Sequence, residues 1–380
     1  MFDFFKLKEE SFGLDISDSS LRIIKLKKKG NFYDLASFGE TRIIPGIIEN
    51  GEIKNKNILA DIIKQLISNI KGEKIKTKNV ICSLPEEKAF LRVIQIPKVK
   101  IKNLKSTVIY EAENYIPLPL EEIYFDFQII KCLNNQQKYF NVLISALPKK
   151  IIETYIDCLK EVGLNPLALE IESLSTSRAL VKKENYTQSI FLIDLSQSKT
   201  SFIIFSGYSV RFTSSIPVSG QHFTEIISKA FKIDITEAEI LKIKWSLGQN
   251  NEFNIKNGKE KEIEKDEIFE LLTPLMTELV EQIKKHLIYY QTHIAKEHLP
   301  IKEQKVKEIL LCGKGAALKG LAYFLSLELK LPVIVGNPWI NVLPKSSDFL
   351  SFLKDKQLSY EDTLGYSTAI GLALRGIKYD

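Results

Sequence analysis

The chain has no apolar run long enough to span a bilayer, because charged residues or proline interrupt even the stretch from Leu321 to Val335. Its first residues, Met1-Phe2-Asp3-Phe4-Phe5-Lys6, do not have the apolar core and cleavage site of a signal peptide. These two absences predict a protein that stays in the cytoplasm.

Cysteine is scarce, and the charge is modest. Cys82, Cys132, Cys158 and Cys312 have neither metal-ligand nor redox-motif spacing, so we interpret them as small apolar residues in a reducing compartment. The net charge of +6 is small for 380 residues, and lysines alternate with glutamates in mixed runs, so no nucleic-acid partner is predicted. Nor does any serine with glycine-elbow flanks, or any Cys/His arrangement, indicate nucleophilic catalysis.

What the chain does have is a short pattern that occurs twice. Residues 12–19 read FGLDISDS, and residues 191–198 read FLIDLSQS. An offset of 179 residues separates Asp15 from Asp194, and the same offset superposes Ile23 on Phe202. Each copy predicts a buried strand, a tight polar turn and a second strand.

A carboxylate at the mouth of such a hairpin can hold a hydrated divalent cation, while the backbone N–H groups of the turn face phosphate oxygens. Two such hairpins predict a nucleoside triphosphate held by both. The alternative is that Asp15 and Asp194 only cap their turns, which is the commoner role of aspartate at the end of a strand.

Alternating strands and helices predict α/β architecture in two lobes. A block of strand, helix, strand, strand, helix between Glu86 and Leu164 predicts a small inserted α+β module. A strand at 308–312 leads into a glycine turn at 313–321, which suits a base or ribose lying against backbone. The predicted boundaries are 1–85 for the first lobe, 86–164 for the inserted module, 165–189 for a return to the first lobe, 190–345 for the second lobe with a polar loop at 248–265, and 346–380 for a final return to the first lobe.

The ordered hairpins and glycine turn resemble the nucleotide-binding fold of actin, Hsp70 and hexokinase. Further segments are similar to the family of type IV pilus assembly proteins PilM, relatives of the division protein FtsA. These segments are Ser83-Leu84-Pro85, residues 110–117 (YEAENYIP), residues 170–173 (EIES) and residues 369–375 (AIGLALR). The resemblance implies a two-lobed actin-like fold in which the inserted module replaces an actin subdomain.

By this resemblance, the chain binds ATP and Mg²⁺. Asp15 and Asp194 would hold the metal through water, and Glu239 and Lys242 would flank the adenosine. Glu170 is a weak candidate for positioning water, and a solvated carboxylate beside a helix start is its alternative role. The remaining nucleotide-binding candidates are Ser17, Ser19, Ser20, Arg22, Ser196, Ser198, Thr200, Gly313, Lys314, Gly315 and Ala316.

Three positions depart from the family pattern, which has glycine where this chain has Ser17, Ser196 and Lys314. A side chain there takes space close to the nucleotide and, at positive φ, costs roughly 1 kcal/mol or more. We therefore expect ATP binding in weakened form. A serine hydroxyl could itself donate to a phosphate oxygen.

The function implied is a cytoplasmic scaffold of the type IV pilus machine at the inner face of the inner membrane. Its partner would be the amino-terminal tail of a PilN-like inner-membrane protein, gripped between the first lobe and the inserted module, so that membrane contact is indirect. Hydrolysis would be slow at most. Contacts with other motor components and self-association stay open. The alternatives are an FtsA-like division or type II secretion component, or a working ATPase or sugar kinase of the same fold.

Overall fold

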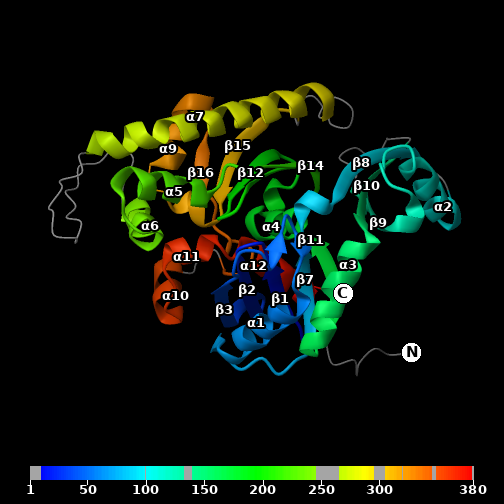
Figure 1. Cartoon of the computed structure of the whole chain (residues 1–380). Coiled ribbons are helices and arrows are strands. Elements are labelled where there is room, and N and C mark those ends of the chain that lie inside the picture. Colours follow the sequence, from blue (N-terminus) through cyan, green and yellow to red (C-terminus); the bar gives the residue numbers. More distant parts are fainter. Residues whose placement is uncertain are drawn as a thin grey trace. The chain divides into compact units, whose positions relative to one another are not determined.

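The fold is taken from a computed structural model that describes residues 10–98, 100–131, 139–244, 265–294, 304–318, 320–344 and 348–378 (Figure 1). The chain divides into two compact units. Unit 1 comprises Met1–Tyr186, Tyr208–Val210 and Pro338–Asp380, and unit 2 comprises Thr187–Gly207 and Arg211–Asn337. The predicted polar loop at 248–265 falls almost wholly outside the described residues.

Unit 1 is built on a mixed sheet of six strands. In spatial order these are β11 (Asn165–Ile171), β7 (Asn79–Leu84), β1 (Phe12–Ile16), β2 (Ser20–Lys29), β3 (Phe32–Arg42) and β6 (Lys71–Gly72). The β1–β2 and β2–β3 pairs are antiparallel, whereas β1–β7 and β7–β11 are parallel. A short hairpin of β4 (Ile48–Glu49) and β5 (Glu52–Ile53) follows β3.

Helices cover both faces of this sheet because side chains of successive strand residues point to opposite faces. One core cluster joins Phe12, Leu14 and Ile16 to α1 (Lys56–Ser68) and α3 (Lys149–Val162). A second cluster joins Ile24 and Leu26 to residues of the carboxyl-terminal helices. The helices of unit 1 after β11 are α4 (Glu172–Leu180), α10 (Phe349–Lys356), α11 (Tyr360–Leu364) and α12 (Ser367–Lys378).

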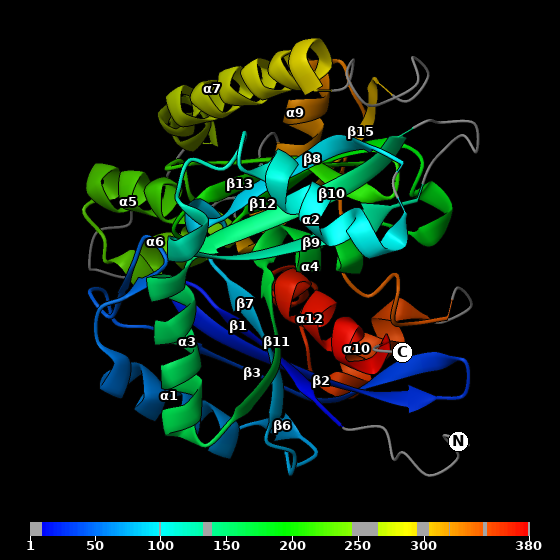
Figure 2. The ribbon, with the colours of Figure 1, turned by 90° about the vertical axis from the view of Figure 1, so that its right-hand side faces the viewer.

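Between β7 and β11 the chain forms a separate three-stranded antiparallel sheet, ordered β8 (Phe90–Pro97), β10 (Tyr139–Pro148) and β9 (Ile123–Ile130) (Figure 2). Helix α2 (Ile101–Ala112) packs Leu104 and Val108 against one face of it. The helix α3 that follows ends at Gly163, whose φ of 85° is the left-handed conformation that favours glycine. The predicted sequence of elements in this block is confirmed.

Unit 2 is built on a five-stranded sheet ordered β14 (Ser209–Ile216), β13 (Thr200–Ser206), β12 (Ser189–Leu195), β15 (Val306–Cys312) and β16 (Val333–Val335). Its helices are α5 (Gly220–Phe231), α6 (Ile235–Lys244), α7 (Lys265–Tyr289), which continues as a π-helix over Tyr290–Ile294, and α9 (Leu321–Leu329). No described helix of either unit is both long and apolar enough to cross a membrane.

The two sheets have the same plan. The order β3-β2-β1-β7-β11 in unit 1 corresponds to β14-β13-β12-β15-β16 in unit 2. Each sheet has a central strand that pairs antiparallel with the next strand of its hairpin and parallel with a later strand. Each unit is therefore one copy of a duplicated α/β design.

Candidate functional site

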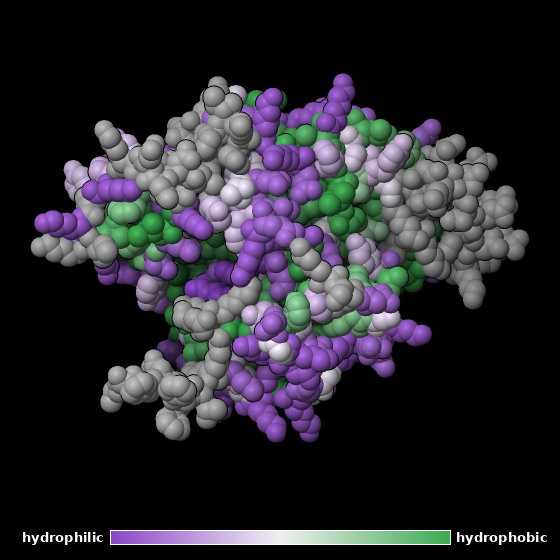
Figure 3. All heavy atoms as spheres, turned by 180° about the vertical axis from the view of Figure 1, so that it is seen from behind, coloured by the Kyte–Doolittle hydropathy of each residue, from purple (hydrophilic) through white to green (hydrophobic). Residues whose placement is uncertain are grey.

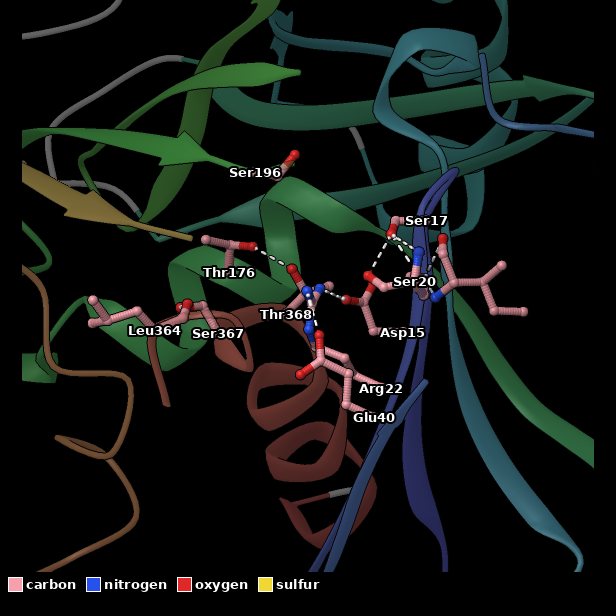
Figure 4. A network of polar contacts seen from close by, with 12 residues as sticks. Asp15, Ser17, Ser20, Arg22, Glu40, Thr176, Ser196, Leu364, Ser367 and Thr368 are labelled. Atoms are coloured by element: carbon pink, nitrogen blue, oxygen red, sulfur yellow. Dashed lines mark hydrogen bonds and ion pairs between the residues drawn. The ribbon is translucent and has the colours of Figure 1, made fainter. Parts of the chain in front are cut away.

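The turn between β1 and β2 is closed by Ser17 (Figure 4). Both the backbone N–H and the hydroxyl of Ser17 donate to the carbonyl oxygen of Ser20, each at 3.0 Å. The backbone N–H of Ser20 donates back to Ser17 Oγ at 3.2 Å. The serine that replaces the family's glycine is thus the residue that closes the turn.

The turn between β12 and β13 repeats this geometry. The N–H of Ser196 donates to the Lys199 carbonyl oxygen at 3.0 Å, and its hydroxyl donates to the same oxygen at 2.9 Å. Ser17 and Ser196 are 179 residues apart, as are Ser20 and Lys199, and the strand registers follow the same offset. The predicted pair of strand-turn-strand hairpins is confirmed down to equivalent hydrogen bonds.

Asp15 lies in a buried charged row on unit 1 (Figure 4). Arg22, directly across the hairpin from it, places Nη1 at 3.7 Å from Asp15 Oδ2 and Nη2 at 3.0 Å from Glu40 Oε1. The side chains of Asp15 and Arg22 are 6% and 9% exposed. Arg22 therefore balances two carboxylates within unit 1.

Asp194 of unit 2 lies against the glycine turn after β15. Gly313 has a φ of 77°, and a Cβ there would overlap Asp194 Oδ1 and lie 2.5 Å from the Leu195 carbonyl oxygen. A Cβ on Gly315 would lie 2.9 Å from the same oxygen. Both glycines are needed because the turn packs directly on the end of β12. Ala316 is buried and donates its N–H to the Gly313 carbonyl at 3.1 Å.

The amino terminus of α5 joins the same cluster. The N–H of Gly220 donates to the Ser196 carbonyl at 2.9 Å, and Lys242 Nζ donates to the Gly220 carbonyl at 2.9 Å. Lys242 also donates to Glu239 Oε2 at 2.7 Å and to Thr224 Oγ1 at 2.8 Å. Burial lowers the pKa of Lys242, and the carboxylate of Glu239 partly offsets this. The sequence predicted Glu239 and Lys242 but not Thr224 or Gly220, which follow an ordinary Ser219 cap.

The residues that replace family glycines carry no backbone strain. Among the described residues other than glycine, positive φ occurs at Asn50, Tyr208, Lys232, Lys330 and Gln357. Neither serine of the hairpin turns nor Lys314 adopts it. Any weakening of nucleotide binding must therefore come from the side chains themselves.

Two candidates have structural roles. Thr200 is fully buried, and its hydroxyl donates to the Val218 carbonyl at 2.6 Å, while its contact with a nucleotide stays a prediction. Glu170 is buried and accepts hydrogen bonds from Arg178, Arg375 and Ser175, so the alternative of a solvated carboxylate is wrong, and its role in positioning water stays a prediction. Both carboxylate oxygens of Glu170 accept hydrogen bonds within unit 1.

Ser19 and Ser198 are half-buried turn residues, and the Ser19 carbonyl accepts from the Ile43 N–H at 2.9 Å. Two polar contacts near the unit 1 hairpin were not predicted. Ser83 Oγ accepts from the Ile16 N–H at 2.8 Å, and the hydroxyls of Thr176 and Thr368 lie 2.9 Å apart (Figure 4). These pairs join residues far apart in the sequence, which no local pattern indicates. In the described part of the chain, no three His, Cys, Asp or Glu side chains group as a metal site.

Solved structures define the class of this protein as actin-like. The chain is similar to a structure described as a PilM-PilN type IV pilus biogenesis complex, with a TM-score of 0.75, 24% identity, and coverage of 98% of this chain and 100% of that one. It is also similar to MreB5 of Spiroplasma citri bound to ADP, with a TM-score of 0.56, 14% identity, and coverage of 97% and 96%. The predicted actin-like α/β fold is confirmed.

Sequence comparison then identifies the family. The model for type IV pilus assembly protein PilM matches residues 13–377, and the chain belongs to this family. FtsA of Escherichia coli K12 is 20% identical over 358 residues, covering 90% of this chain and 80% of FtsA. FtsA of Bacillus subtilis is 26% identical over 162 residues, covering 43% and 32%. The predicted relationship to FtsA is confirmed.

Proposed function

We propose that this chain is an ATP-binding scaffold of the type IV pilus machine that binds the amino-terminal cytoplasmic tail of a PilN-like inner-membrane protein. Membership of the PilM family supports the place in pilus assembly. The solved complex to which the chain is similar pairs a PilM with a PilN, which supports the partner. The chain would then work in the cytoplasm, held at the inner face of the inner membrane by its partner.

The duplicated hairpin carries the proposal of ATP binding. In each hairpin, an aspartate and a serine lie at the end of a buried strand. Unit 2 adds the tightly packed glycines of the turn after β15. Related folds bind nucleotide, since MreB5 of Spiroplasma citri was solved with ADP and with AMPPNP. In this proposal Asp15 and Asp194 hold Mg²⁺ through water, and Glu239 and Lys242 lie beside the adenosine.

We propose weak ATP binding and slow hydrolysis. The hydroxyls of Ser17 and Ser196 are already used to close their turns, so neither is available to a phosphate without breaking a hydrogen bond. Glu170, the only residue that the sequence offered for positioning water, is held by two arginines. A working kinase would instead need a positioned general base near the γ-phosphate.

The test is calorimetric titration of Mg-ATP into the full chain and into two isosteric variants, Asp15→Asn and Asp194→Asn. We expect saturable binding to the natural chain and about tenfold weaker binding to each variant when Mg²⁺ is present, because an amide holds hydrated Mg²⁺ less well. Asp61→Asn, on the exposed face of α1, is the matched control and should bind like the natural chain.

Absence of saturable binding at about 1 mM nucleotide would remove ATP from the proposal and leave a scaffold without a ligand. Turnover of many ATP molecules per minute would instead favour the alternative of an active ATPase or sugar kinase.

A further inference from the structure

Exposed lysines cluster at one end of the unit 1 sheet. Strand β2 ends where β1 and β7 begin, because β2 is antiparallel to β1 and β7 is parallel to it. Residues 73–78 cross this same end, since Thr77 Oγ1 donates to the Glu10 carbonyl at 2.6 Å and Lys27 Nζ lies 2.5 Å from Glu73 Oε1. We call this surface the basic end, and it comprises Lys27, Lys28, Lys29 and Phe32 of the β2–β3 hairpin with Lys74, Lys76 and Lys78.

Most of this charge is not neutralised. Three nearby acidic residues already form ion pairs. Glu73 pairs with Lys27, Glu10 pairs with Lys25 at 2.7 Å and Asp34 pairs with Lys356 at 3.1 Å. The five other lysines of the basic end are exposed and form no ion pair with any described residue: Lys28, Lys29, Lys74, Lys76 and Lys78. The basic end is therefore strongly positive although the whole chain is nearly balanced.

An aromatic ring stands among these lysines. Gly30, with a φ of 63°, opens a two-residue turn, so that Lys29 pairs directly with Phe32 across the hairpin. Phe32 is 46% exposed. The hairpin extends from the sheet in Figure 2, and hydrophilic residues predominate in the lower half of the view in Figure 3.

We propose that the basic end docks directly on an anionic phospholipid membrane, with Phe32 entering the headgroup region. Clustered exposed lysines are attracted to the negative surface of the cytoplasmic leaflet, and aromatic rings are favoured at the interface between headgroups and acyl chains. A projecting hairpin with an aromatic tip beside lysines suits a flat anionic surface. A duplex nucleic acid would use the lysines, but its bases are already stacked on one another and would leave the exposed ring without a partner.

This contact is additional to any that a PilN-like partner provides, and it does not depend on the proposed function. A polybasic patch alone gives weak, reversible attachment, because stable anchoring takes two signals. The basic end would therefore orient unit 1 on the bilayer and raise the local concentration of the chain near an inner-membrane partner.

The test is co-sedimentation of the purified full chain with phosphatidylcholine vesicles that contain or lack 30% phosphatidylglycerol, at about physiological salt. We expect binding only to the anionic vesicles. Lys28→Glu/Lys29→Glu should lower the partition coefficient at least about 30-fold, because the loss of each lysine near the surface weakens binding about fivefold. Phe32→Ser should lower it less, and circular dichroism checks that each variant is folded.

The matched control is Lys284→Glu/Lys285→Glu, which reverses two adjacent exposed lysines of α7 and should leave vesicle binding unchanged. Equal binding to both vesicle types overturns the proposal. So does full binding by Lys28→Glu/Lys29→Glu, because that variant keeps residues 1–9 with Phe2, Phe4 and Phe5 intact. Tighter binding to a 30-base-pair DNA than to anionic vesicles also overturns it, in favour of a nucleic-acid site.

Discussion

The buried carboxylate of Glu170 accepts four hydrogen bonds from side chains of unit 1. Its Oε2 accepts from Arg178 Nη1 at 2.5 Å and from Ser175 Oγ at 2.6 Å, and its Oε1 accepts from Arg178 Nη2 at 2.6 Å and from Arg375 Nη1 at 2.8 Å. Arg178 also donates to the Gly371 carbonyl at 3.0 Å. One buried charge thus joins β11, α4 and α12.

We predict that Glu170→Gln lowers the free energy of unfolding by about 2–3 kcal/mol. Removing one partner of a buried ion pair costs about 3–5 kcal/mol, and the value is discounted because each arginine side chain is 25% exposed. Urea unfolding measures the change. The control Glu153→Gln, on the exposed side of α3, should change stability by less than about 0.5 kcal/mol.

The same carboxyl predicts acid sensitivity. Burial alone would raise the pKa of Glu170, but Arg178 and Arg375 outweigh it, so the pKa lies below its usual 4.5. The stabilisation is therefore complete above about pH 4.5 and is lost as the pH falls through the lowered pKa. The difference in stability between the natural chain and Glu170→Gln should shrink in acid. A difference that stays constant from pH 7 to pH 3 would contradict this account.

The described cysteines should be inert. Cys82, Cys158 and Cys312 are buried free thiols. Burial raises the pKa of Cys158 to about 12 and that of Cys82 above its usual value, so little thiolate forms at neutral pH. In a Cys132→Ser variant we predict no labelling by a thiol reagent within minutes at pH 8, and full labelling in denaturant. Rapid labelling of the folded variant would show that unit 1 or unit 2 opens readily.

Among the secondary-structure elements, the packing of helix α12 depends on two glycines, Gly13 and Gly371. A Cβ on Gly13 of β1 would lie 2.5 Å from the Ala369 carbonyl oxygen and 2.7 Å from the Ala373 nitrogen. A Cβ on Gly371 would overlap the carbonyl of Ser175 in α4. Helix α12 therefore crosses β1 and α4 backbone to backbone, which accounts for the small residues of the AIGLALR segment.

We predict that Gly371→Ala costs at least about 2 kcal/mol of stability, because the added methyl group meets backbone that cannot rotate away. Gly376→Ala, in the same helix, is the matched control. Its Cβ would meet the Ser11 hydroxyl, which can turn aside, so the cost should be below about 1 kcal/mol. Thermal melts of the two variants compare them directly, and equal melting temperatures would contradict the proposed crossing.

Local patterns predicted the elements that depend on nearby residues. The two hairpins follow from a repeated strand-turn-strand pattern, and the end of α3 follows from Gly163. The short edge strands β6 and β16 were not predicted, because two or three residues show no periodicity. The contacts of Glu170 with Arg375 and of Thr176 with Thr368 join residues about two hundred positions apart, and only the folded chain brings them together.

In the candidate site, too, the sequence pattern predicted positions in the hairpins but not contacts between distant residues. The offset of 179 residues predicted that Asp15 and Ser17 occupy the same hairpin positions as Asp194 and Ser196, and the strand registers and turn hydrogen bonds confirm this equivalence. Thr200 was assigned to the nucleotide from its position after the second turn, and this assignment stays a prediction. Its register opposite Leu195 directs its hydroxyl to the Val218 carbonyl.

At the scale of the whole molecule, each unit repeats one sheet order and one turn geometry. In our proposal, binding of Mg-ATP biases the conformation that binds the PilN-like tail. Binding of the tail and binding of ATP should then affect each other by the same factor, because coupling between two sites is reciprocal.

The most direct test is calorimetric titration of the full chain with a synthetic peptide that copies the amino-terminal tail of a PilN-like protein, with and without Mg-ATP. We predict saturable binding with a Kd on the order of micromolar, and a Kd that shifts when Mg-ATP is present. A scrambled peptide of the same composition is the control. No binding of the natural peptide up to about 1 mM, by a chain that is folded, would contradict the scaffold function.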